Sequence, residues 1–558
     1  MSDDGLRTLL VGIDAACERT LDPLFAAGEL PTLEGLLKTG ASGPLESQIP
    51  PWTASAWPSL YTGTNPGKHG VFSFLSFDGY DWDVVNATDV RERTIWEYCD
   101  REGLSSVVVN VPVTHPSRPF DGALIPGYTA PEDPDCHPEG LLEEVRAAIG
   151  EYRVYPVDDS TNAYRDCVRS RGEAFRYLTD RVDPDFGFLQ FQATDTIFHK
   201  RPEDDEAIRA IYREVDRQVE RVLTDCEPTT VVVASDHGIG PYEGSEFRIN
   251  DFLHETGYVE TVRGGPGVPT FSRALDRSLA AGEYRAGGDR SDGARSAGKR
   301  SGGDRSAGNR AGGDRSGLER AVEGMAKVGL TSQRIERLLD RIGLAEFVAE
   351  RVPDAVVSAG TTQVDFPASK AYVRSRIELG VRINLAGREP DGVVPQSAYD
   401  ETRRELIEHL RAVRTPDGEP VFETVVPREA IFHGPESHRA VDIVTVPADY
   451  DHYLSATIRG ERFGEPTEPW NHKRDGIVAI AGGDVDRRVG VGDAHLCDVA
   501  PTVLATLGIP AAERMDGRVL ACVSAAGTRS YPRLDDDRSV ETADERVERR
   551  LADLGYLE

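Results

Sequence analysis

Six carboxylate and imidazole side chains stand beside short apolar runs of the kind that form buried strands. Five of them follow such a run and the sixth precedes one. Carboxylate oxygen and imidazole nitrogen are donors for zinc and related divalent cations, and a catalytic site leaves one position around the cation open. Six donors and one hydroxyl suffice for two cations. The donors are Asp14, Asp195, His199, Asp236, His237 and His472.

Taken singly, these residues are weak evidence. An Asp after a strand can equally cap the next helix, and a lone His is more often packed in the core or exposed at the surface. In the segment DTIFH, Asp195 and His199 are four residues apart, which puts both side chains on one helical face. Many helices carry such a pair by chance. The prediction of a metal site therefore rests on the donors taken together.

The candidate nucleophile lies in the segment PPWTASAWPSLYTGTNPGKHG, residues 50–70. Turn-forming residues followed by an apolar stretch predict a tight loop that enters a helix, where free backbone N–H groups and the helix dipole favour a phosphate. Thr53 lies near this predicted helix start. A threonine hydroxyl is a poor nucleophile at neutral pH, so it needs a base or a metal. Thr53 could also be only an N-cap, with Ser55 as the competing hydroxyl.

The elements that must position these residues alternate between strands and helices. Continuous apolar runs suit strands buried on both faces, and their alternation with helical patterns predicts a doubly wound α/β fold, with a mostly parallel sheet and helices on both faces. Ligands of such folds gather at the carboxyl ends of the strands. The predicted strands are residues 8–13, 105–111, 186–191 and 229–234, and the predicted helices are 32–38, 94–102, 140–148 and 204–223.

The composition changes between residues 285 and 317, where Gly, Arg, Ser, Asp and Ala dominate and GGDRS occurs three times. Such a segment cannot bury a core, so we expect a disordered linker. It lies in a predicted cap-like insertion, 242–369, with helices expected at 317–328 and 332–344. The insertion divides a catalytic α/β domain into residues 1–241 and 370–534, and an acidic tail, 535–558, follows.

After the insertion the strand and helix pattern resumes. Strands are predicted at 381–385, 441–446 and 476–481, and helices at 397–413 and 497–507. This part of the chain should therefore complete the catalytic domain.

Charge and cysteine usage exclude several classes of protein. The net charge of −31 makes general binding to a nucleic-acid backbone improbable, and the acidic, Lys-poor composition indicates adaptation to high salt. Seven scattered cysteines without a CxxC pair fit a reducing compartment. We find no signal peptide and no run of 18 apolar residues, so we expect a cytoplasmic protein without a membrane span.

Seven segments in order resemble the type I phosphodiesterase/nucleotide pyrophosphatase family of the alkaline phosphatase superfamily. The resemblance runs from Asp14 to about Leu520 and implies a phosphoesterase. The segments are VGIDAA, PPWTASAWPSLYTGTNPGKHG, ATDTIFH, ASDHG, VRINLAGREPDGVV, NHKRDGIVAIAGG and CDVAPTVLATLGIPAAERMDGRVL.

The resemblance also implies roles for single residues. Thr53 would be the nucleophile, forming a covalent phosphothreonine, and the two cations would be zinc, with manganese as the alternative. His495 competes with His472 as the third imidazole ligand but lacks the strand that follows the family position. The resemblance assigns one cation to Asp14, Thr53, Asp236 and His237, and the other to Asp195, His199 and His472.

One departure from the family pattern bears on the substrate. Nucleotide pyrophosphatases have an Asn shortly after the HG pair that donates to a phosphate oxygen, whereas this chain has Ser73 and Phe74. Arg388 or Lys68 could supply the missing donor, although Arg388 could equally pair with Glu389. The expected partner is a small phosphoester. A phosphomonoesterase, a phosphonate hydrolase and a non-catalytic metal-binding relic are the alternatives.

Overall fold

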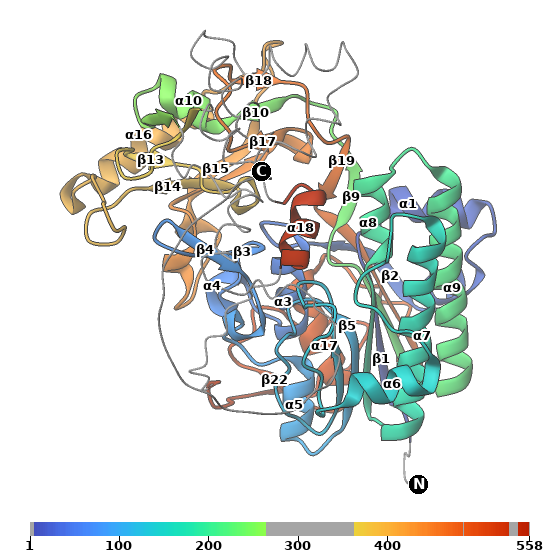
Figure 1. Ribbon diagram of the computed structural model, residues 1–558. Coiled ribbons are helices and arrows are strands. Elements are labelled where there is room, and N and C mark those ends of the chain that lie inside the picture. The colour runs from blue at the N-terminus through green and yellow to red at the C-terminus, as the bar shows by residue number, and fades with distance from the viewer. Residues whose placement is uncertain (1–4, 264–361, 484, 535–544, 557–558) are drawn as a thin grey trace, which may run out of the picture.

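An eight-stranded sheet forms the centre of the computed structural model, which describes residues 5–263, 362–483, 485–534 and 545–556 (Figure 1). Most neighbouring strands are parallel, and β20 is antiparallel to both of its neighbours. The predicted fold class is therefore confirmed. In spatial order the strands are β21 (Ala494–His495), β2 (Ala41–Glu46), β20 (Asp475–Gly482), β8 (Thr230–Ala234), β1 (Thr8–Ile13), β7 (Phe186–Phe191), β5 (Ser106–Val111) and β6 (Gly122–Pro126).

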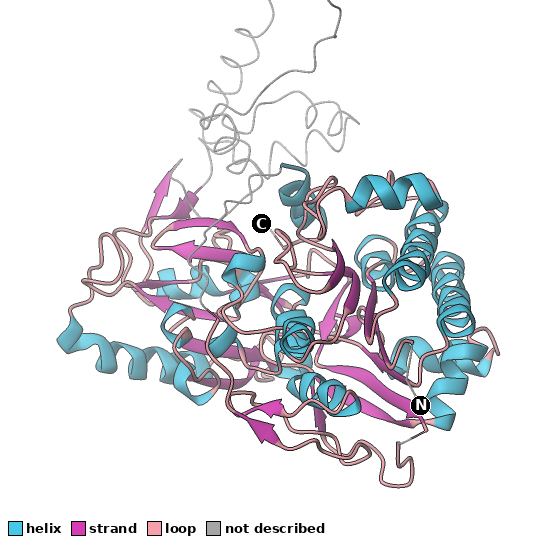
Figure 2. Cartoon of the chain, turned by 90° about the horizontal axis from the view of Figure 1, so that it is seen from below, coloured by secondary structure: helices cyan, strands magenta, loops and turns pink. Residues whose placement is uncertain are grey.

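Helices cover both faces of this sheet (Figure 2). Because successive side chains of a strand point to opposite faces, Leu9 and Val11 of β1 pack into one apolar cluster and Leu10 packs into the other. The first face carries α1 (Glu18–Ala26), α2 (Pro31–Thr39), α6 (Leu141–Ile149), α7 (Thr161–Val182), α8 (Ala193–Lys200) and α9 (Asp205–Cys226), and the second carries α3 (Thr53–Thr62), α5 (Ile95–Arg101) and α17 (Val499–Thr506).

A second lobe of small sheets lies beside the central sheet (Figure 1). Its four-stranded sheet has the order β13-β14-β16-β15, and every pair in it is antiparallel. The lobe contains β10 (Glu246–Arg248), α10 (Ile249–Glu255), β13 (Ala371–Tyr372), β14 (Gly380–Ile383), α16 (Tyr399–Arg411), β15 (Phe422–Pro427), β16 (Ile443–Pro447), β17 (Tyr453–Ser455) and β18 (Phe463–Gly464), and the pair β11 (Thr261–Arg263) and β12 (Thr362–Val364) lies near it in sequence.

The predicted strands 381–385 and 441–446 thus form, but they belong to this lobe. An apolar run indicates a strand without naming its partner, and antiparallel neighbours need no crossover helix. Of the described residues after 369, the central sheet takes only β20 and β21. The predicted linker 285–317 and the predicted helices 317–328 and 332–344 lie outside the described residues. The proposed domain boundaries stay predictions.

Several central elements were not predicted from the sequence, and β2 and α7 show why. β2 contains Gly43 and Pro44, which are rare inside strands, and it pairs with the short strand β21 on its other side. The long helix α7 is rich in charged residues, and its buried face includes polar residues such as Ser170 and Arg171 beside Phe175. Neither segment shows the strong apolar run that signals a buried element.

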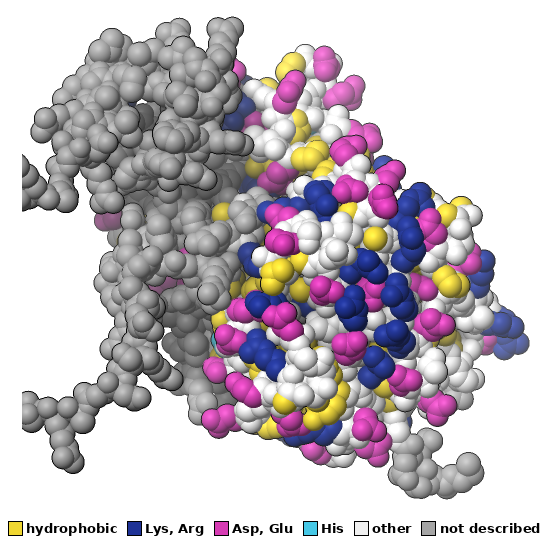
Figure 3. All heavy atoms as spheres, turned by 45° about the vertical axis from the view of Figure 1, so that its right-hand side comes forward, with side chains coloured by type: hydrophobic (Ala, Val, Ile, Leu, Met, Phe, Trp, Pro, Cys, Tyr) yellow, Lys and Arg dark blue, Asp and Glu magenta, His cyan; other side chains and the backbone are white. Residues whose placement is uncertain are grey.

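The outer surface of α7 and α9 is charged. Figure 3 shows basic and acidic side chains intermingled over this face. Exposed ion pairs join Arg176 to Asp225 at 2.6 Å and Arg169 to Asp166 at 3.0 Å. Within the described parts of the chain, no helix has both the length and the apolar character that a bilayer span requires.

Gly12 of β1 provides the space in which Trp57 of α3 packs against the sheet. A Cβ atom on Gly12 would lie 2.5 Å from Cη2 of the Trp57 ring, which is fully buried. The Gly12→Ala variant should therefore lose about 1–3 kcal/mol of unfolding free energy, because the ring must move within a packed core. Urea denaturation measures this loss.

Gly35 provides the matched control. It lies in α2, and an added Cβ would meet nothing within 4 Å. Gly35→Ala should leave stability unchanged or raise it by up to about 1 kcal/mol. Equal effects of the two substitutions would contradict the packing role of Gly12.

Candidate active site

Three carboxylates converge because they follow three neighbouring strands. β7, β1 and β8 are adjacent and parallel, so their carboxyl ends meet at one edge of the sheet. Asp14 follows β1, Asp236 follows β8, and Asp195 lies in the first turn of α8 after β7. Ala15 has a left-handed backbone, φ 58°, and its N–H donates to Asp236 Oδ1 at 3.3 Å. All three carboxylates are fully buried.

His472 reaches the same edge from a strand that runs in the opposite direction. It lies on β19 (Trp470–Lys473), directly before β20. Because β20 is antiparallel to β8, the start of β20 lies at the carboxyl end of β8. β19 also pairs with β9 (Gly238–Pro241), which brings His472 opposite Ile239 and beside His237. His472, which precedes β20, therefore lies at the same edge of the sheet as the Asp residues that follow β1, β7 and β8.

Thr53 is the first residue of α3, and its side chain is fully buried at the site. Its Oγ1 lies 3.2 Å from Nε2 of His237. The competing hydroxyl of Ser55 donates to the carbonyl of Val71 at 2.8 Å. Of the two hydroxyls, the structure thus brings that of Thr53 to the carboxylates and imidazoles.

The first donor cluster comprises Asp14, Asp236, His237 and Thr53. Nε2 of His237 lies 3.1 Å from Asp236 Oδ2 and 3.5 Å from Asp14 Oδ1. With the Thr53 hydroxyl, these atoms surround one small volume at the sheet edge.

The second donor cluster comprises Asp195, His199 and His472. Asp195 Oδ1 lies 3.3 Å from His199 Nε2 and 3.4 Å from His472 Nε2, and the two nitrogens are 3.1 Å apart. The rings of His237 and His472 stack at a centroid distance of 3.6 Å, so the two clusters share a wall. All six predicted donors therefore come together in two adjacent groups.

Backbone carbonyls orient two of the imidazoles. Nδ1–H of His237 donates to the carbonyl of Gly238, and Nδ1–H of His472 donates to the carbonyl of Pro51, each at 2.9 Å. A ring nitrogen that donates in this way leaves Nε2 with its lone pair toward the cluster, as a metal ligand requires.

The carboxylate atoms that face the clusters lack hydrogen-bond donors. Among the described residues, Asp14 Oδ1, Asp195 Oδ1 and Asp236 Oδ2 are buried and accept no hydrogen bond. An unpaired buried carboxylate is costly unless a cation binds it. Orphaned oxygens opposite imidazole lone pairs therefore fit divalent cations at both clusters.

The pKa values express the same imbalance. Burial raises the pKa of the Asp14 carboxyl well above its usual range, and the charges of Asp236 and Asp195 raise it further. Burial lowers the pKa of His472 to about 3, and the neighbouring His237 acts in the same direction. For His237 burial lowers the pKa, but the charge of Asp236 outweighs it and the pKa is raised. These shifts express the burial and mutual repulsion of the carboxylates, which a bound cation would relieve.

Supporting residues that the sequence analysis missed hold Asp14 in place. Its Oδ2 accepts from the indole N–H of Trp57 at 2.9 Å and from the amide of Gln190 at 2.8 Å. Asn110 donates in turn to Oε1 of Gln190 at 2.7 Å. Two signals could have found them: Trp57 stands four residues after Thr53 on one helix, and Gln190 is a polar residue in a buried strand.

The two basic side chains that were candidates for binding the substrate, Arg388 and Lys68, form ion pairs within the fold. Arg388 binds Asp442 at 2.7 Å and Glu389 at 2.8 Å, the pairing that was the alternative for this residue. Lys68 donates to Arg514 O at 2.7 Å and pairs with Asp516.

Burial of Asp442 explains the position of Arg388. The Asp442 carboxylate is fully buried, and its pKa is about 2, because the hydrogen bonds and charge of Arg388 outweigh the effect of burial. Arg388 therefore stabilises the second lobe.

His495 lies on β21, apart from the clusters, and its Nδ1 accepts from the N–H of Cys497 at 3.2 Å. This bond caps the short helical turn at 496–498, which leads into α17. In the structure His472, and not His495, faces the other donors.

A residue near the C-terminus also enters the site. Tyr556 is buried, and its hydroxyl lies 2.8 Å from His472 Nε2 and 3.3 Å from His199 Nε2. It follows α18 (Glu545–Asp553), which belongs to the tail that the sequence analysis left without a role. No local pattern marks it, since it lies more than eighty positions after His472.

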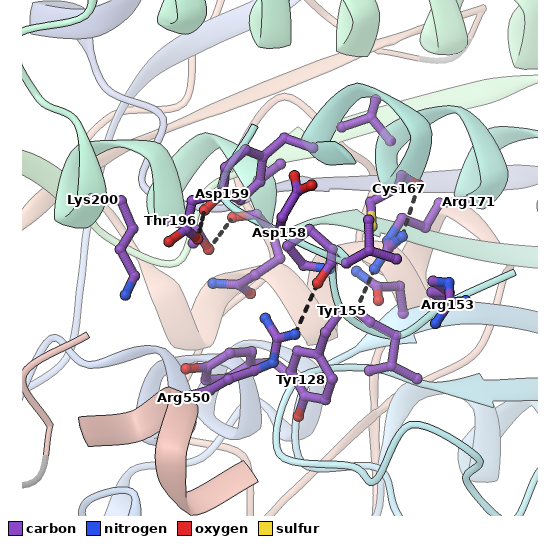
Figure 4. A pocket seen from close by; sticks show the side chains of 18 of the residues that line it. Tyr128, Arg153, Tyr155, Asp158, Asp159, Cys167, Arg171, Thr196, Lys200 and Arg550 are labelled. Atoms are coloured by element: carbon purple, nitrogen blue, oxygen red, sulfur yellow. Dashed lines mark hydrogen bonds between the residues drawn. The ribbon is translucent and has the colours of Figure 1, made fainter. Parts of the chain in front are cut away.

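A cavity of about 460 Å³ is lined by Thr196 and Lys200, which directly follow Asp195 and His199 in the sequence (Figure 4). Thr196 and Lys200 of α8 line one side, and Arg550 and Leu554 line another. Its wall holds charges of both signs, with Arg153 among the basic and Asp158 among the acidic residues. It is large enough for a small polar group next to the donor clusters.

Comparisons with known proteins agree on the fold. The family model for type I phosphodiesterase/nucleotide pyrophosphatase matches residues 8–291. The chain resembles phosphonoacetate hydrolase from Sinorhizobium meliloti 1021 in its complexes with phosphonoformate and phosphonoacetate, with a TM-score of 0.54, 15% and 16% identity, and coverage of 90% of this chain and 96% of that one. It also resembles wild-type alkaline phosphatase PafA, with a TM-score of 0.50, 12% identity, and coverage of 94% and 99%. The comparison with curated proteins gives no match.

Removing His472 should remove one cation. The His472→Ala variant is expected to retain about one equivalent of zinc after dialysis where the wild type retains about two, because the second cluster loses one of three protein donors. Metal analysis of the dialysed proteins gives these ratios. The His495→Ala variant is the control and should keep both equivalents. Loss of zinc from the His495 variant, with none from the His472 variant, would contradict the cluster assignment.

Proposed function

Because the chain belongs to the type I phosphodiesterase/nucleotide pyrophosphatase family, we propose that it hydrolyses phosphoric esters at two adjacent divalent-cation positions, with Thr53 as the nucleophile. The family assignment supports a phosphoesterase of the alkaline phosphatase superfamily. One observation supports the more specific proposal of two cation positions with Thr53 as the nucleophile. A buried threonine hydroxyl at a helix start lies against carboxylates and imidazoles whose inward atoms lack partners.

Each cation position has its own donors. Asp14, Thr53, Asp236 and His237 would hold one cation, and Asp195, His199 and His472 the other. Imidazole and carboxylate donors suit zinc, with manganese as the alternative. When bound, such cations supply Lewis-acid charge and make a hydroxyl or water nucleophilic near neutral pH.

The start of α3 supplies the nucleophile and an anion site together. Within this turn, the N–H groups of Ser55 and Ala56 donate to the carbonyl of Trp52 at 2.9 and 2.8 Å. The helix has no acceptor of its own for the N–H groups of Thr53 and Ala54, which suit a phosphate oxygen. A phosphate seated on this turn would lie next to the Thr53 hydroxyl.

The proposed reaction proceeds in two displacements. Thr53 Oγ1 loses its proton and forms a bond to phosphorus while the bond from phosphorus to the ester oxygen breaks, and the alcohol leaves. Water then attacks the phosphothreonine, releases the phosphate or phosphate monoester, and restores the hydroxyl. Trp57 and Gln190 keep Asp14 oriented through both steps.

A second candidate is a phosphomonoesterase or phosphonate hydrolase at the same site. Ser73 and Phe74 stand where nucleotide pyrophosphatases have an amide donor. Ser73 Oγ accepts from the N–H of Leu75 at 2.9 Å, and the ring of Phe74 stacks on Tyr556. Neither side chain replaces that amide, which favours substrates that do not depend on it.

Removal of the nucleophile tests the mechanism. The Thr53→Ala variant is expected to lose at least about 10³-fold in kcat on p-nitrophenyl esters, because it lacks the hydroxyl that lies against His237 and the first donor cluster. It should still bind zinc through the remaining donors. Ser55→Ala is the matched control, and its kcat should stay within about threefold of the wild type. Full activity in the Thr53 variant would refute the assignment.

Comparison of two substrates tests the ester class. We expect a higher kcat/KM for bis-(p-nitrophenyl) phosphate than for p-nitrophenyl phosphate, as the family assignment suggests. The assays should be run with zinc and with manganese, in low and in high salt. A consistent preference for the monoester would favour the second candidate.

A further inference from the structure

The hydroxyl of Tyr556 completes a four-atom set at the second cluster. Its partners are Asp195 Oδ1, His199 Nε2 and His472 Nε2. Five separations that join these four atoms lie between 2.8 and 3.4 Å. Zinc ligands at about 2.0–2.2 Å in a tetrahedron stand roughly 3.3–3.6 Å from one another. Three of the five separations fall in this range, and the two shorter ones, 3.1 and 2.8 Å, both involve His472 Nε2, so a small shift of the His472 ring would bring the hydroxyl to a fourth ligand position.

Packing fixes the ring of Tyr556 in this position. It stacks on the ring of Phe74 at a centroid distance of 4.1 Å and an interplanar angle of 28°. Its side chain is 2% exposed, and Leu551 and Leu554 of the same segment are buried in the same apolar cluster. The contact between Tyr556 and Phe74 is thus part of the buried core and does not lie at the surface.

The backbone next to Tyr556 is anchored from the second lobe. Arg376 donates from Nε to the carbonyl of Gly555 at 2.7 Å, and it also pairs with Glu468 at 2.9 Å. Figure 1 shows α18 between the small sheets of the second lobe and the central sheet. The segment therefore links the second lobe to the site.

A second anchor holds α18 at the cavity. Arg550 donates to the carbonyl of Pro156 at 2.9 Å, and its guanidinium lies 4.2 Å from the centroid of the Tyr155 ring (Figure 4). These two polar contacts lie at the cavity, whose wall includes Arg550 and Leu554, and would be exchanged when a substrate enters it. The apolar contacts of Leu551 and Tyr556 would have to open as well.

We propose that Tyr556 is a fourth ligand at the second cation position and closes it in the resting protein. A catalytic cation needs an open position for a substrate oxygen. The phenol oxygen fills that position, so the C-terminal segment must withdraw when substrate binds. This inference rests on the proposed function, since it requires that a cation occupies the second cluster.

The test compares Tyr556→Phe with a matched variant in the full-length chain. Tyr128→Phe is the match: the ring of Tyr128 contacts the same Phe74 edge-on, and its buried hydroxyl has no hydrogen-bond partner among the described residues. Both changes remove one buried hydroxyl and preserve the ring. Only the first removes a donor from the second cluster.

Calorimetric titration with zinc, and then with orthophosphate on the zinc-loaded protein, gives the decisive numbers. Tyr556→Phe should bind its second zinc equivalent at least about 10-fold more weakly. It should bind orthophosphate more tightly, because no protein oxygen competes for the position. It should also change the visible absorption spectrum of the cobalt-substituted protein, which reports coordination. Tyr128→Phe should leave the affinity for the second zinc equivalent and the cobalt spectrum unchanged.

Different failures have different meanings. If the wild type binds two zinc ions and Tyr556→Phe binds both equally well, the ligand role is refuted and the proposed function stands. If Tyr556→Phe instead weakens only orthophosphate binding, the hydroxyl contacts substrate and not the cation, and the inference is again refuted. If the wild type binds no zinc, both this inference and the two-cation proposal fail.

Discussion

The structure depends on compensation of buried negative charge at one edge of the central sheet. Three carboxylates without access to solvent lie in two adjacent groups that share His237, and three of their oxygens accept no hydrogen bond within the described residues. Such an arrangement costs several kcal/mol for each unpaired ion in a protein interior. Divalent cations at the two proposed positions would offset this cost, and the imidazole lone pairs around the carboxylates would offer them further ligands. The donor set is therefore of the kind that suits bound cations.

Chain topology explains how distant residues reach this edge. Parallel strands β7, β1 and β8 deliver one Asp each, and the reversed direction of β20 allows His472 to arrive from before its strand. α3 brings Thr53 to the same place with its first turn. Gly12 matters here because it admits Trp57, whose indole N–H orients Asp14. The packing of α3 against the sheet therefore determines the orientation of Asp14 in the site.

Much of this could be predicted from residues beside apolar runs. The runs before Asp14, Asp195 and Asp236 are buried strands, and the carboxyl ends of such strands meet, so the donors could be expected together. The fold class and the family followed from the same segments. The role of Arg388 could not be predicted in this way, because its partner Asp442 is distant in sequence and only the folded lobe brings them together. The antiparallel lobe was missed because an apolar run does not reveal its neighbours.

The approach of Tyr556 to the site lay furthest beyond prediction. It stands in the short segment LADLGYLE, which follows a charged helix and carries no motif, and its contacts to His199 and His472 arise only when this segment docks in the folded protein. The residue makes the second cluster differ from the first in its access to substrate. The ring of His237 in the first cluster stacks on the ring of His472 in the second, so a displacement of either ring alters the packing of the other.

The most direct test of the account is anomalous diffraction from crystals of the zinc-loaded protein. Two peaks are expected roughly 4 Å apart, one among Asp14, Asp236 and His237 and the other among Asp195, His199 and His472. The account would be contradicted by zinc bound elsewhere on the chain, or by these side chains hydrogen-bonded to one another with no cation between them.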